Sequence, residues 1–261
     1  MLTTSMAYLI EVGGITGDET VLELGAGSGE TSKTLVHRIH SGQVTLLDAS
    51  PQMVALATRV FERDNHVDLA LCSVPEYTVD HIDLGEREFT TIVIHQSFQD
   101  LATAFSRNLE VLGRWCIEKL LPGGRLIVAA HNTVVETERP PGYETWEDEF
   151  RRVLYTEIRR IPEWRSHIRP RQQDHLYKPE HIEKSFLSQG FELRRKEKLT
   201  IQMSMNERIL MWSVPAVMNA IVDVQTGGTD PIDKVCARLN DKFQGLPTMP
   251  RTTTYWVFQR S

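Results

Sequence analysis

The sequence predicts a doubly wound α/β fold, and three observations support this prediction. Short apolar runs without polar alternation recur through the first half of the chain, and segments with helical spacing separate them. Strands whose two faces are both buried show this continuous apolar pattern, which is typical of a parallel sheet covered by helices on both sides. One apolar run leads directly into a glycine-rich turn, as the ligand-binding strands of such sheets do.

Composition and charge restrict the class of protein. The chain has 261 residues, 41% of them hydrophobic, and 35 acidic against 29 basic residues leave a formal net charge of −6. A chain of this length buries enough apolar surface to fold as one domain, residues 1–261, without disulfides or a structural metal. Nucleic acids and anionic membranes attract basic surfaces, so the acidic balance favours a small-molecule partner over either of them.

The cysteines and the apolar segments bear on location. Cys72, Cys116 and Cys236 are far apart and odd in number, a pattern typical of a reducing compartment. The first residues show neither the cationic start nor the cleavage site of a secretory signal. The most apolar run, Ile209–Val222, is too short to cross a bilayer and contains Pro215. We therefore expect a cytoplasmic protein without a membrane segment.

The first half of the chain is expected to alternate strands with helices. One helix, which carries Tyr8, precedes a strand at Val21–Leu24, a helix at Thr31–Ile39, a strand at Gln43–Leu47 and a helix at Pro51–Arg63. Pro51 suits the first position of a helix, because the N–H group that proline lacks has no partner there. Strands at Val67–Leu71, Phe89–Ile94 and Arg125–Ala130 and a helix at Ala104–Leu121 complete this half.

The second half contains two long insertions. A helix at Pro179–Gln189, closed by Gly190, and strands at Phe191–Met203 and Thr252–Gln259 continue the fold. Residues 132–178 and 204–250 interrupt this order, and such long segments between core elements commonly form lids or pocket walls. The first insertion suits either a clamp for an anionic or aromatic substrate or a solvated helix face with paired charges. The arginine cluster that suggests these two interpretations is Arg151, Arg152, Arg159, Arg160, Arg165, Arg169 and Arg171.

The segment Val21–Glu30, VLELGAGSGE, carries the strongest chemical signal. Its glycines at positions 25, 27 and 29 follow a strand and precede a helix, where a tight turn lets the backbone approach a ligand. A dinucleotide fingerprint requires glycine at the position of Glu30, whose negative charge would repel a pyrophosphate. Glu23, near the end of the strand, favours instead a nucleoside ligand whose tail carries an ammonium group.

Asp48 supplies a second signal at the end of the next expected strand. A carboxylate at this place in such folds accepts hydrogen bonds from both ribose hydroxyls. Met53, on the helix that follows, is placed to cover one face of a flat base. Two such motifs on consecutive strands predict that this edge of the sheet binds a nucleoside cofactor.

Four motifs of the chain resemble those of the class I S-adenosylmethionine-dependent methyltransferases. They are ELGAGSG, LLDASPQM, FTTIVIH and LLPGGRLIVA. The resemblance covers residues 20–130 well and the C-terminal part more loosely. It implies a Rossmann-like, seven-stranded sheet that is mostly parallel, with the last strand antiparallel and lids built from the two insertions. It also implies S-adenosylmethionine as the cofactor.

The resemblance further implies roles for individual residues. Gly25, Ala26 and Gly27 pass the methionine moiety, Asp48 holds the ribose, and the turn at Ser73 and Val74 approaches the adenine. The family often has Asp or Glu in that turn, whereas Ser73 offers a hydroxyl that can also accept a hydrogen bond. The candidate cofactor contacts are Tyr8, Glu23, Gly25, Ala26, Gly27, Asp48, Ala49, Met53, Ser73, Val74 and His95.

Polar residues after the middle strands are the candidates for the chemistry. His95 follows one strand, and His131 and Asn132 follow the next, where open α/β sheets place ligand groups. A histidine has the pKa range of a general base, which a hydroxyl acceptor needs, although a structural role suits it equally well. Tyr177 and Ser204 are further candidates at the same rim. The sequence contains no clustered Cys or His at metal-ligand spacing, so we expect no metal.

Three functions remain open at this point. The first is methyl transfer from S-adenosylmethionine to an oxygen, nitrogen or carbon nucleophile of a small molecule. The second is intramolecular cyclisation of the same cofactor, as in azetidine-2-carboxylate formation, with release of methylthioadenosine. The third is a cofactor-binding or scaffold protein without catalysis. A homodimer is compatible with each of them.

Overall fold

The computed structural model divides the chain into two compact units. One unit comprises residues 1–132, 176–199 and 252–261, and the other comprises residues 133–175 and 200–251. The bounds of the second unit's two segments lie close to those of the two expected insertions, 132–178 and 204–250. The structure describes residues 2–48, 50–62, 71–73, 84–97, 109–131, 143–165, 168, 179–212, 222, 230–243 and 248–261.

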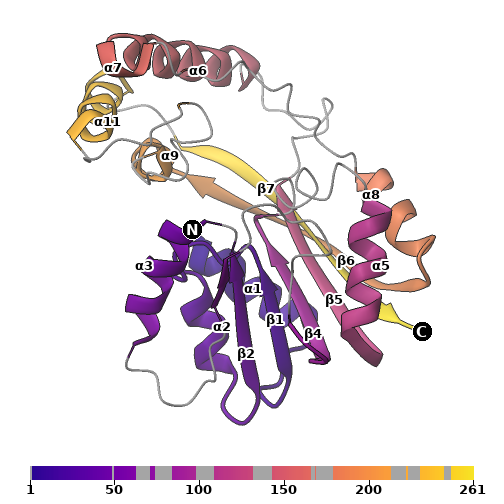
Figure 1. Cartoon of the computed structure of the whole chain (residues 1–261). Coiled ribbons are helices and arrows are strands. Elements are labelled where there is room, and N and C mark those ends of the chain that lie inside the picture. Colours follow the sequence, from indigo (N-terminus) through magenta and orange to yellow (C-terminus); the bar gives the residue numbers. More distant parts are fainter. Residues whose placement is uncertain are drawn as a thin grey trace. The chain divides into compact units, whose positions relative to one another are not determined.

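The first unit is built on a mixed sheet with strand order β3-β2-β1-β4-β5-β7-β6 (Figure 1). Neighbouring strands from β3 to β5 pair parallel, and β7 pairs antiparallel with β5. The expected α/β Rossmann-like arrangement is therefore confirmed. The strands are β1 (Thr20–Leu24), β2 (Gln43–Asp48), β3 (Leu71–Ser73), β4 (Phe89–His95), β5 (Leu120–His131), β6 (Phe191–Met203) and β7 (Met249–Arg260).

Helices cover both faces of this sheet (Figure 1). On one face, α5 (Leu109–Lys119) and α8 (Pro179–Leu187) form a core with sheet residues that include Trp256. On the other face, α1 (Leu2–Gly13), α2 (Ser32–Arg38) and α3 (Pro51–Phe61) bury their apolar residues against a set that includes Tyr255. Burial on both faces explains the continuous apolar runs, because every position of a central strand then meets a helix.

Two boundaries differ from the expected ones. Leu120 and Leu121 belong to β5 and not to the preceding helix. Leu120 pairs with Phe89 of β4 and is fully buried, so sheet pairing outweighs the helical spacing of the leucines. In β3, the described strand starts at Leu71, where the expected strand ended, while residues 63–70 lie outside the described residues.

In the part that the structure describes, the second unit consists mainly of helices with an apolar core of their own, and it also includes the end of β6 and the start of β7. Its helices are α6 (Tyr143–Arg159), α7 (Pro162–Arg165), α9 (Met205–Trp212) and α11 (Asp230–Phe243). Trp164 is 2% exposed in this core, so it anchors the unit. Arg152 pairs with Glu149 and Arg160 pairs with Glu157, both at 2.6 Å, which supports the paired-charge interpretation for these two arginines. No helix in the described part of the chain is long and apolar enough to span a membrane.

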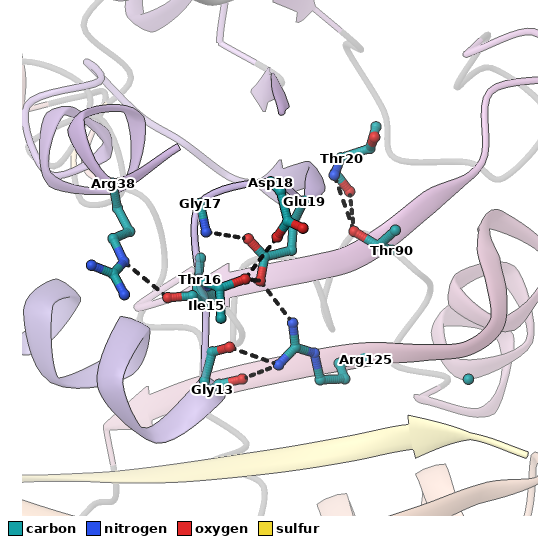
Figure 2. Close-up of polar contacts among 12 residues, drawn as sticks. Gly13, Ile15, Thr16, Gly17, Asp18, Glu19, Thr20, Arg38, Thr90 and Arg125 are labelled. Atoms are coloured by element: carbon teal, nitrogen blue, oxygen red, sulfur yellow. Dashed lines mark hydrogen bonds and ion pairs between the residues drawn. The ribbon is translucent and has the colours of Figure 1, made fainter. Parts of the chain in front are cut away.

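The strands β1, β2, β4 and β5 begin at one edge of the sheet, the amino edge, and end at the other, the carboxyl edge. At the amino edge, Glu19 accepts hydrogen bonds from the backbone N–H groups of Thr16 and Gly17, both at 2.8 Å, and from Arg125 at 3.0 Å (Figure 2). Arg125 also donates to the Gly13 carbonyl at 2.7 Å. Burial alone would raise the pKa of Glu19, but these backbone donors outweigh it and lower the pKa to about 2.

Candidate functional site

At the carboxyl edge, β1 runs into the glycine turn that the sequence analysis singles out. Gly25, Gly27 and Gly29 have φ angles of 73°, 60° and 80°, in the left-handed region that favours glycine. The backbone N–H groups of Gly25 and Ala26 donate to the Leu47 carbonyl at 2.7 and 3.1 Å. The turn is therefore fixed against the end of β2.

The three glycines differ in what surrounds them. A Cβ atom at Gly25 would lie 2.4 Å from the Cβ of Ser97, and one at Gly29 would lie 2.7 Å from the Phe61 ring. A Cβ atom at Gly27 would meet no atom of the described residues within 4 Å. Packing within the protein thus requires Gly25 and Gly29, whereas Gly27 leaves open space beside its backbone. An open backbone at this point allows a ligand to approach closely.

Backbone donors hold Asp48 beside this turn. Its Oδ2 accepts a hydrogen bond from the Gly27 N–H, and its Oδ1 accepts one from the Ser50 N–H, both at 2.8 Å. Ser50 in turn caps α3, because its hydroxyl accepts a hydrogen bond from the Met53 N–H at 3.3 Å. Each carboxylate oxygen has a further lone-pair site, so Asp48 keeps acceptor capacity for a pair of ligand hydroxyls.

Glu23, on β1, is buried just before the glycine turn. Its side chain is 1% exposed, and its Oε2 has no hydrogen-bond partner within the described residues. Burial raises the pKa of Glu23 to about 7. The negative charge of Asp48 also raises this pKa, whereas the Ser32 hydroxyl lowers it. A buried carboxyl group without full hydrogen bonding is costly to ionise, and such groups concentrate at functional sites.

His95, the last residue of β4, belongs to a buried hydrogen-bond cluster. Its Nε2 lies 3.0 Å from the Ser5 hydroxyl oxygen on α1, and the Tyr255 hydroxyl of β7 lies 2.7 Å from the same oxygen. The side-chain amide of Gln96 donates to this oxygen at 3.0 Å. Tyr8 packs edge-on against Tyr255, with ring centroids 5.0 Å apart. The cluster therefore ties α1 to the end of β4 and to β7.

The turn after β4 is fixed in an unusual conformation. Gln96 has a φ angle of 65°, and no other non-glycine residue in the described ranges has a positive φ. Its backbone N–H donates to the Ala129 carbonyl at 2.9 Å, and the Ser97 hydroxyl donates to the Leu24 carbonyl at 2.7 Å. Strained backbone of this kind is enriched at functional sites, which agrees with its place at the carboxyl edge.

A family comparison decides what kind of domain surrounds this edge. Residues 21–116 match the model of a family described as a methyltransferase domain. The matched segment contains the glycine turn, Asp48 and the end of β4. This segment is therefore similar to a methyltransferase domain. The resemblance that the motifs indicate is thus confirmed for this segment, while no curated protein sequence matches the chain significantly.

Solved structures share the fold of the methyltransferase domain and its surroundings at low sequence identity. The cyclopropane synthase MmaA2 from Mycobacterium tuberculosis has a TM-score of 0.60 at 14% identity, over 98% of this chain and 83% of that one. The 4+2 cyclase SpnF has a TM-score of 0.56 at 14% identity, over 99% and 81%. Phosphoethanolamine N-methyltransferase 2 from Haemonchus contortus, solved with S-adenosyl-L-methionine, has a TM-score of 0.56 at 15% identity, over 98% and 52%.

The sheet of the first unit brings several of the predicted site residues to one edge. Ser73 at the end of β3 pairs in register with Asp48, and β4 and β5 end at His95 and His131. Met53 is half-buried in the first turn of α3. The predicted residues Ala49, Val74, Asn132 and Tyr177 lie outside the described residues. Within the described ranges, no group of three or more His, Cys, Asp or Glu side chains gathers as a metal site would.

Two polar residues of the His95 cluster, Ser5 and Tyr255, are not among the predicted site residues. Ser5 and Tyr255, which are 2% and 0% exposed, hold the His95 cluster together. The available signal was a lone serine beside the buried residues Met6 and Leu9 of α1. Ser204, a predicted rim residue, caps α9 in the second unit.

The Ser204 cap is reciprocal. The Ser204 hydroxyl accepts a hydrogen bond from the Glu207 N–H at 3.2 Å, and the Ser204 N–H donates to the Glu207 carboxylate at 2.8 Å. This arrangement is a capping box, which satisfies two backbone donors at the start of a helix. Helix capping therefore accounts for Ser204 in structural terms.

Proposed function

We propose that the protein is an S-adenosylmethionine-dependent methyltransferase that acts on a small molecule. The observation that carries the proposal is the geometry of Gly27 and Asp48 at the carboxyl edge, where an open backbone stands beside an oriented carboxylate. The match of residues 21–116 to a methyltransferase domain supports it. The net charge of −6 favours a small acceptor over a nucleic acid.

The residues at this edge fit the proposed cofactor. Asp48 has acceptor capacity for the two ribose hydroxyls, and Gly27 lets the flexible tail approach the backbone. Glu23 adds a buried carboxyl oxygen without a partner among the described residues, which suits a positively charged tail. When bound, S-adenosylmethionine supplies a methyl group activated by the sulfonium.

The protein's own task is to orient the acceptor and to exclude water. Correct alignment of two reacting groups lowers a barrier substantially without any covalent participation of the protein. A hydroxyl acceptor also needs a base, and our candidates are His95 and His131 at the ends of the adjacent strands β4 and β5. We keep Asn132 and Tyr177 as candidates for orienting the acceptor.

Product identification tests the proposal. Purified protein is incubated with S-adenosylmethionine alone and with carboxylate, phenol and amine acceptors, and the nucleoside product is identified by mass spectrometry. We expect S-adenosylhomocysteine that forms only when an acceptor is present. Methylthioadenosine formed without an acceptor would show intramolecular cyclisation and overturn the proposal. Cofactor binding without any product would show the scaffold function instead.

A matched pair of variants links the product to this site. Asp48→Ala removes the carboxylate, and we expect it to slow product formation at low cofactor concentration. Glu30→Gln changes an acid of the same turn whose side chain is 64% exposed and paired with Lys33, so its activity should equal that of the wild type. If both variants were equally active, the carboxylate of Asp48 would not take part in cofactor binding for this reaction.

A further inference from the structure

The carboxyl groups of Glu23 and Asp48 interact across neighbouring strands, but their surroundings differ. Asp48 has two backbone donors, from Gly27 and Ser50, both at 2.8 Å. Glu23 is 1% exposed, and its Oε2 has no hydrogen-bond partner in the described part of the chain. Two nearby carboxyl groups disfavour each other's negative charge, so the less well solvated one tends to keep its proton.

The elements packed around Glu23 offer little to balance a negative charge. In register it neighbours Leu46 of β2 and Val93 of β4, both fully buried. The helix α1 contributes apolar side chains to the same core, and Ser32 of α2 contributes a hydroxyl. Among the described residues, the charged group that acts on Glu23 is Asp48, which is itself acidic. A proton is therefore the simplest counter-charge for Glu23 in the free protein.

We propose that Glu23 holds a proton in the free protein and releases it when a cationic ligand binds, so that the Glu23 and Asp48 pair exchanges one proton for one positive charge. The inference rests on the proposed function, because it takes S-adenosylmethionine as that ligand. The O–H bond of the Glu23 carboxyl breaks, the proton passes to the buffer, and the carboxylate remains as the counter-charge of an ammonium or sulfonium group. Affinity for the cofactor then depends on pH.

Calorimetric titration at pH 7 measures this exchange directly. The protein is titrated with S-adenosylmethionine and with S-adenosylhomocysteine in phosphate and in Tris, whose different ionisation enthalpies reveal the protons released. We expect roughly half a proton per ligand at pH 7, and an affinity that rises about tenfold from pH 6 to pH 8. Release with both ligands assigns the exchange to the ammonium group, and release with S-adenosylmethionine alone assigns it to the sulfonium.

Two variants attribute the released proton to Glu23. Glu23→Gln keeps the shape of the side chain but cannot ionise, so it should bind without proton release and with a flat pH profile. Glu30→Gln removes an exposed acid of the same turn and should keep the wild-type release. If Glu23→Gln does not fold, infrared difference spectra of the wild type replace it, and a protonated-carboxyl band should disappear on ligand binding.

The possible outcomes separate this inference from the proposed function. Binding of either ligand without proton release, or release that persists in Glu23→Gln, overturns the exchange and leaves the proposed cofactor intact. In the infrared experiment, a spectrum without loss of the carboxyl band has the same meaning. If neither ligand binds between pH 6 and pH 8, the proposed cofactor is wrong and the exchange is overturned with it.

Discussion

Glu19 and Glu23 stand at opposite ends of β1, and both are buried, at 5% and 1% exposure. Burial acts on both carboxyl groups in the same direction, because it disfavours the charged form. The backbone N–H groups of Thr16 and Gly17 outweigh burial and lower the pKa of Glu19 to about 2, and Arg125 donates a further hydrogen bond. Glu23 has an oxygen without a partner in the described residues, and its pKa rises to about 7.

The difference shows that the buried carboxyl group at the amino edge has its hydrogen bonds within the protein, whereas the one at the carboxyl edge does not have all of them among the described residues. At the amino edge, Arg125 of β5 donates to Glu19, which directly precedes β1, and to the carbonyl of Gly13 at the end of α1 (Figure 2). These hydrogen bonds connect β5 to the start of β1 and to the end of α1. At the carboxyl edge, Glu23 keeps an oxygen without a hydrogen-bond partner among the described residues, and Gly27 leaves open space beside its backbone within the same residues. Parallel α/β sheets bind ligands at their carboxyl ends, so we expect changes at the amino edge to affect stability and changes at the carboxyl edge to affect binding.

The largest effect is expected for Glu19→Ala. It removes the acceptor of the Thr16 and Gly17 N–H groups and the partner of Arg125, and it should lower the free energy of unfolding by about 4 kcal/mol. Urea unfolding measures the loss. Asp18→Ala is the control, because Asp18 accepts one exposed hydrogen bond from the Thr16 hydroxyl. Equal losses in both variants, or weaker binding of S-adenosylhomocysteine by folded Glu19→Ala, would contradict the assignment of the amino edge to stability.

The next largest effect is expected for Glu23→Gln, at the other end of β1, and it is a change in how stability depends on pH. The folded protein holds a proton on Glu23 up to a pKa of about 7, whereas the unfolded chain releases it near 4.5, so this group lowers stability as pH rises from 4.5 to 7. Glu23→Gln removes this contribution. Unfolding in urea should show the variant more stable than the wild type by about 3 kcal/mol at pH 8, with no such gain at pH 4. A difference that does not change with pH would show that Glu23 is not protonated in the folded state.

Glu19 should show the opposite pH dependence. Its pKa is lower in the folded protein, so its stabilisation is present above pH 4.5 and is lost as pH falls toward 2. The donors that lower the pKa of Glu19 are local, because Thr16 and Gly17 precede it by three and two positions. Arg125, which is 106 positions away in the chain, adds a further hydrogen bond. Sequence patterns could not predict the contact with Arg125 or the burial of Glu23, because both depend on which distant strands pair.

Local signals explain what the sequence did predict. The glycine turn and Asp48 each depend on a short stretch of chain, and their contact at 2.8 Å follows once β1 and β2 pair. The segment Phe89–Ile94 was predicted as a strand because it is rich in β-branched and apolar residues and does not alternate apolar with polar positions. Leu120 was misassigned to a helix because a short apolar run fits either element until its partner strand is known. The Ser5 cluster was missed because its partners are 90 and 250 positions away.

A smaller effect is expected for Asp48→Ala, this time on binding. The variant loses the acceptor for the ribose hydroxyls and should weaken binding of S-adenosylhomocysteine by about 2 kcal/mol, roughly 30-fold. Isothermal titration calorimetry measures the affinity. The Lys33 partner Glu30 again serves as the control site, since Glu30→Gln leaves the carboxylate of Asp48 in place. Unchanged affinity of Asp48→Ala would refute its contact with the ribose.

The smallest effect on stability is expected for Gly27→Ala. Compared with Gly29→Ala, this variant distinguishes a glycine needed for ligand binding from one needed for packing in the same turn. The variant should lose about 1 kcal/mol of unfolding free energy, because alanine is strained at a φ of 60°. The loss should be no larger, since the new Cβ meets no atom of the described residues within 4 Å. Gly29→Ala should cost more, since its Cβ would lie 2.7 Å from the Phe61 ring. Titration with S-adenosylhomocysteine should show the reverse order, with binding impaired by Gly27→Ala and retained by folded Gly29→Ala. Wild-type affinity in Gly27→Ala would mean that the ligand does not occupy the open space beside Gly27. Of the two features that distinguish the carboxyl edge, only the unpartnered oxygen of Glu23 would then remain as a candidate ligand contact.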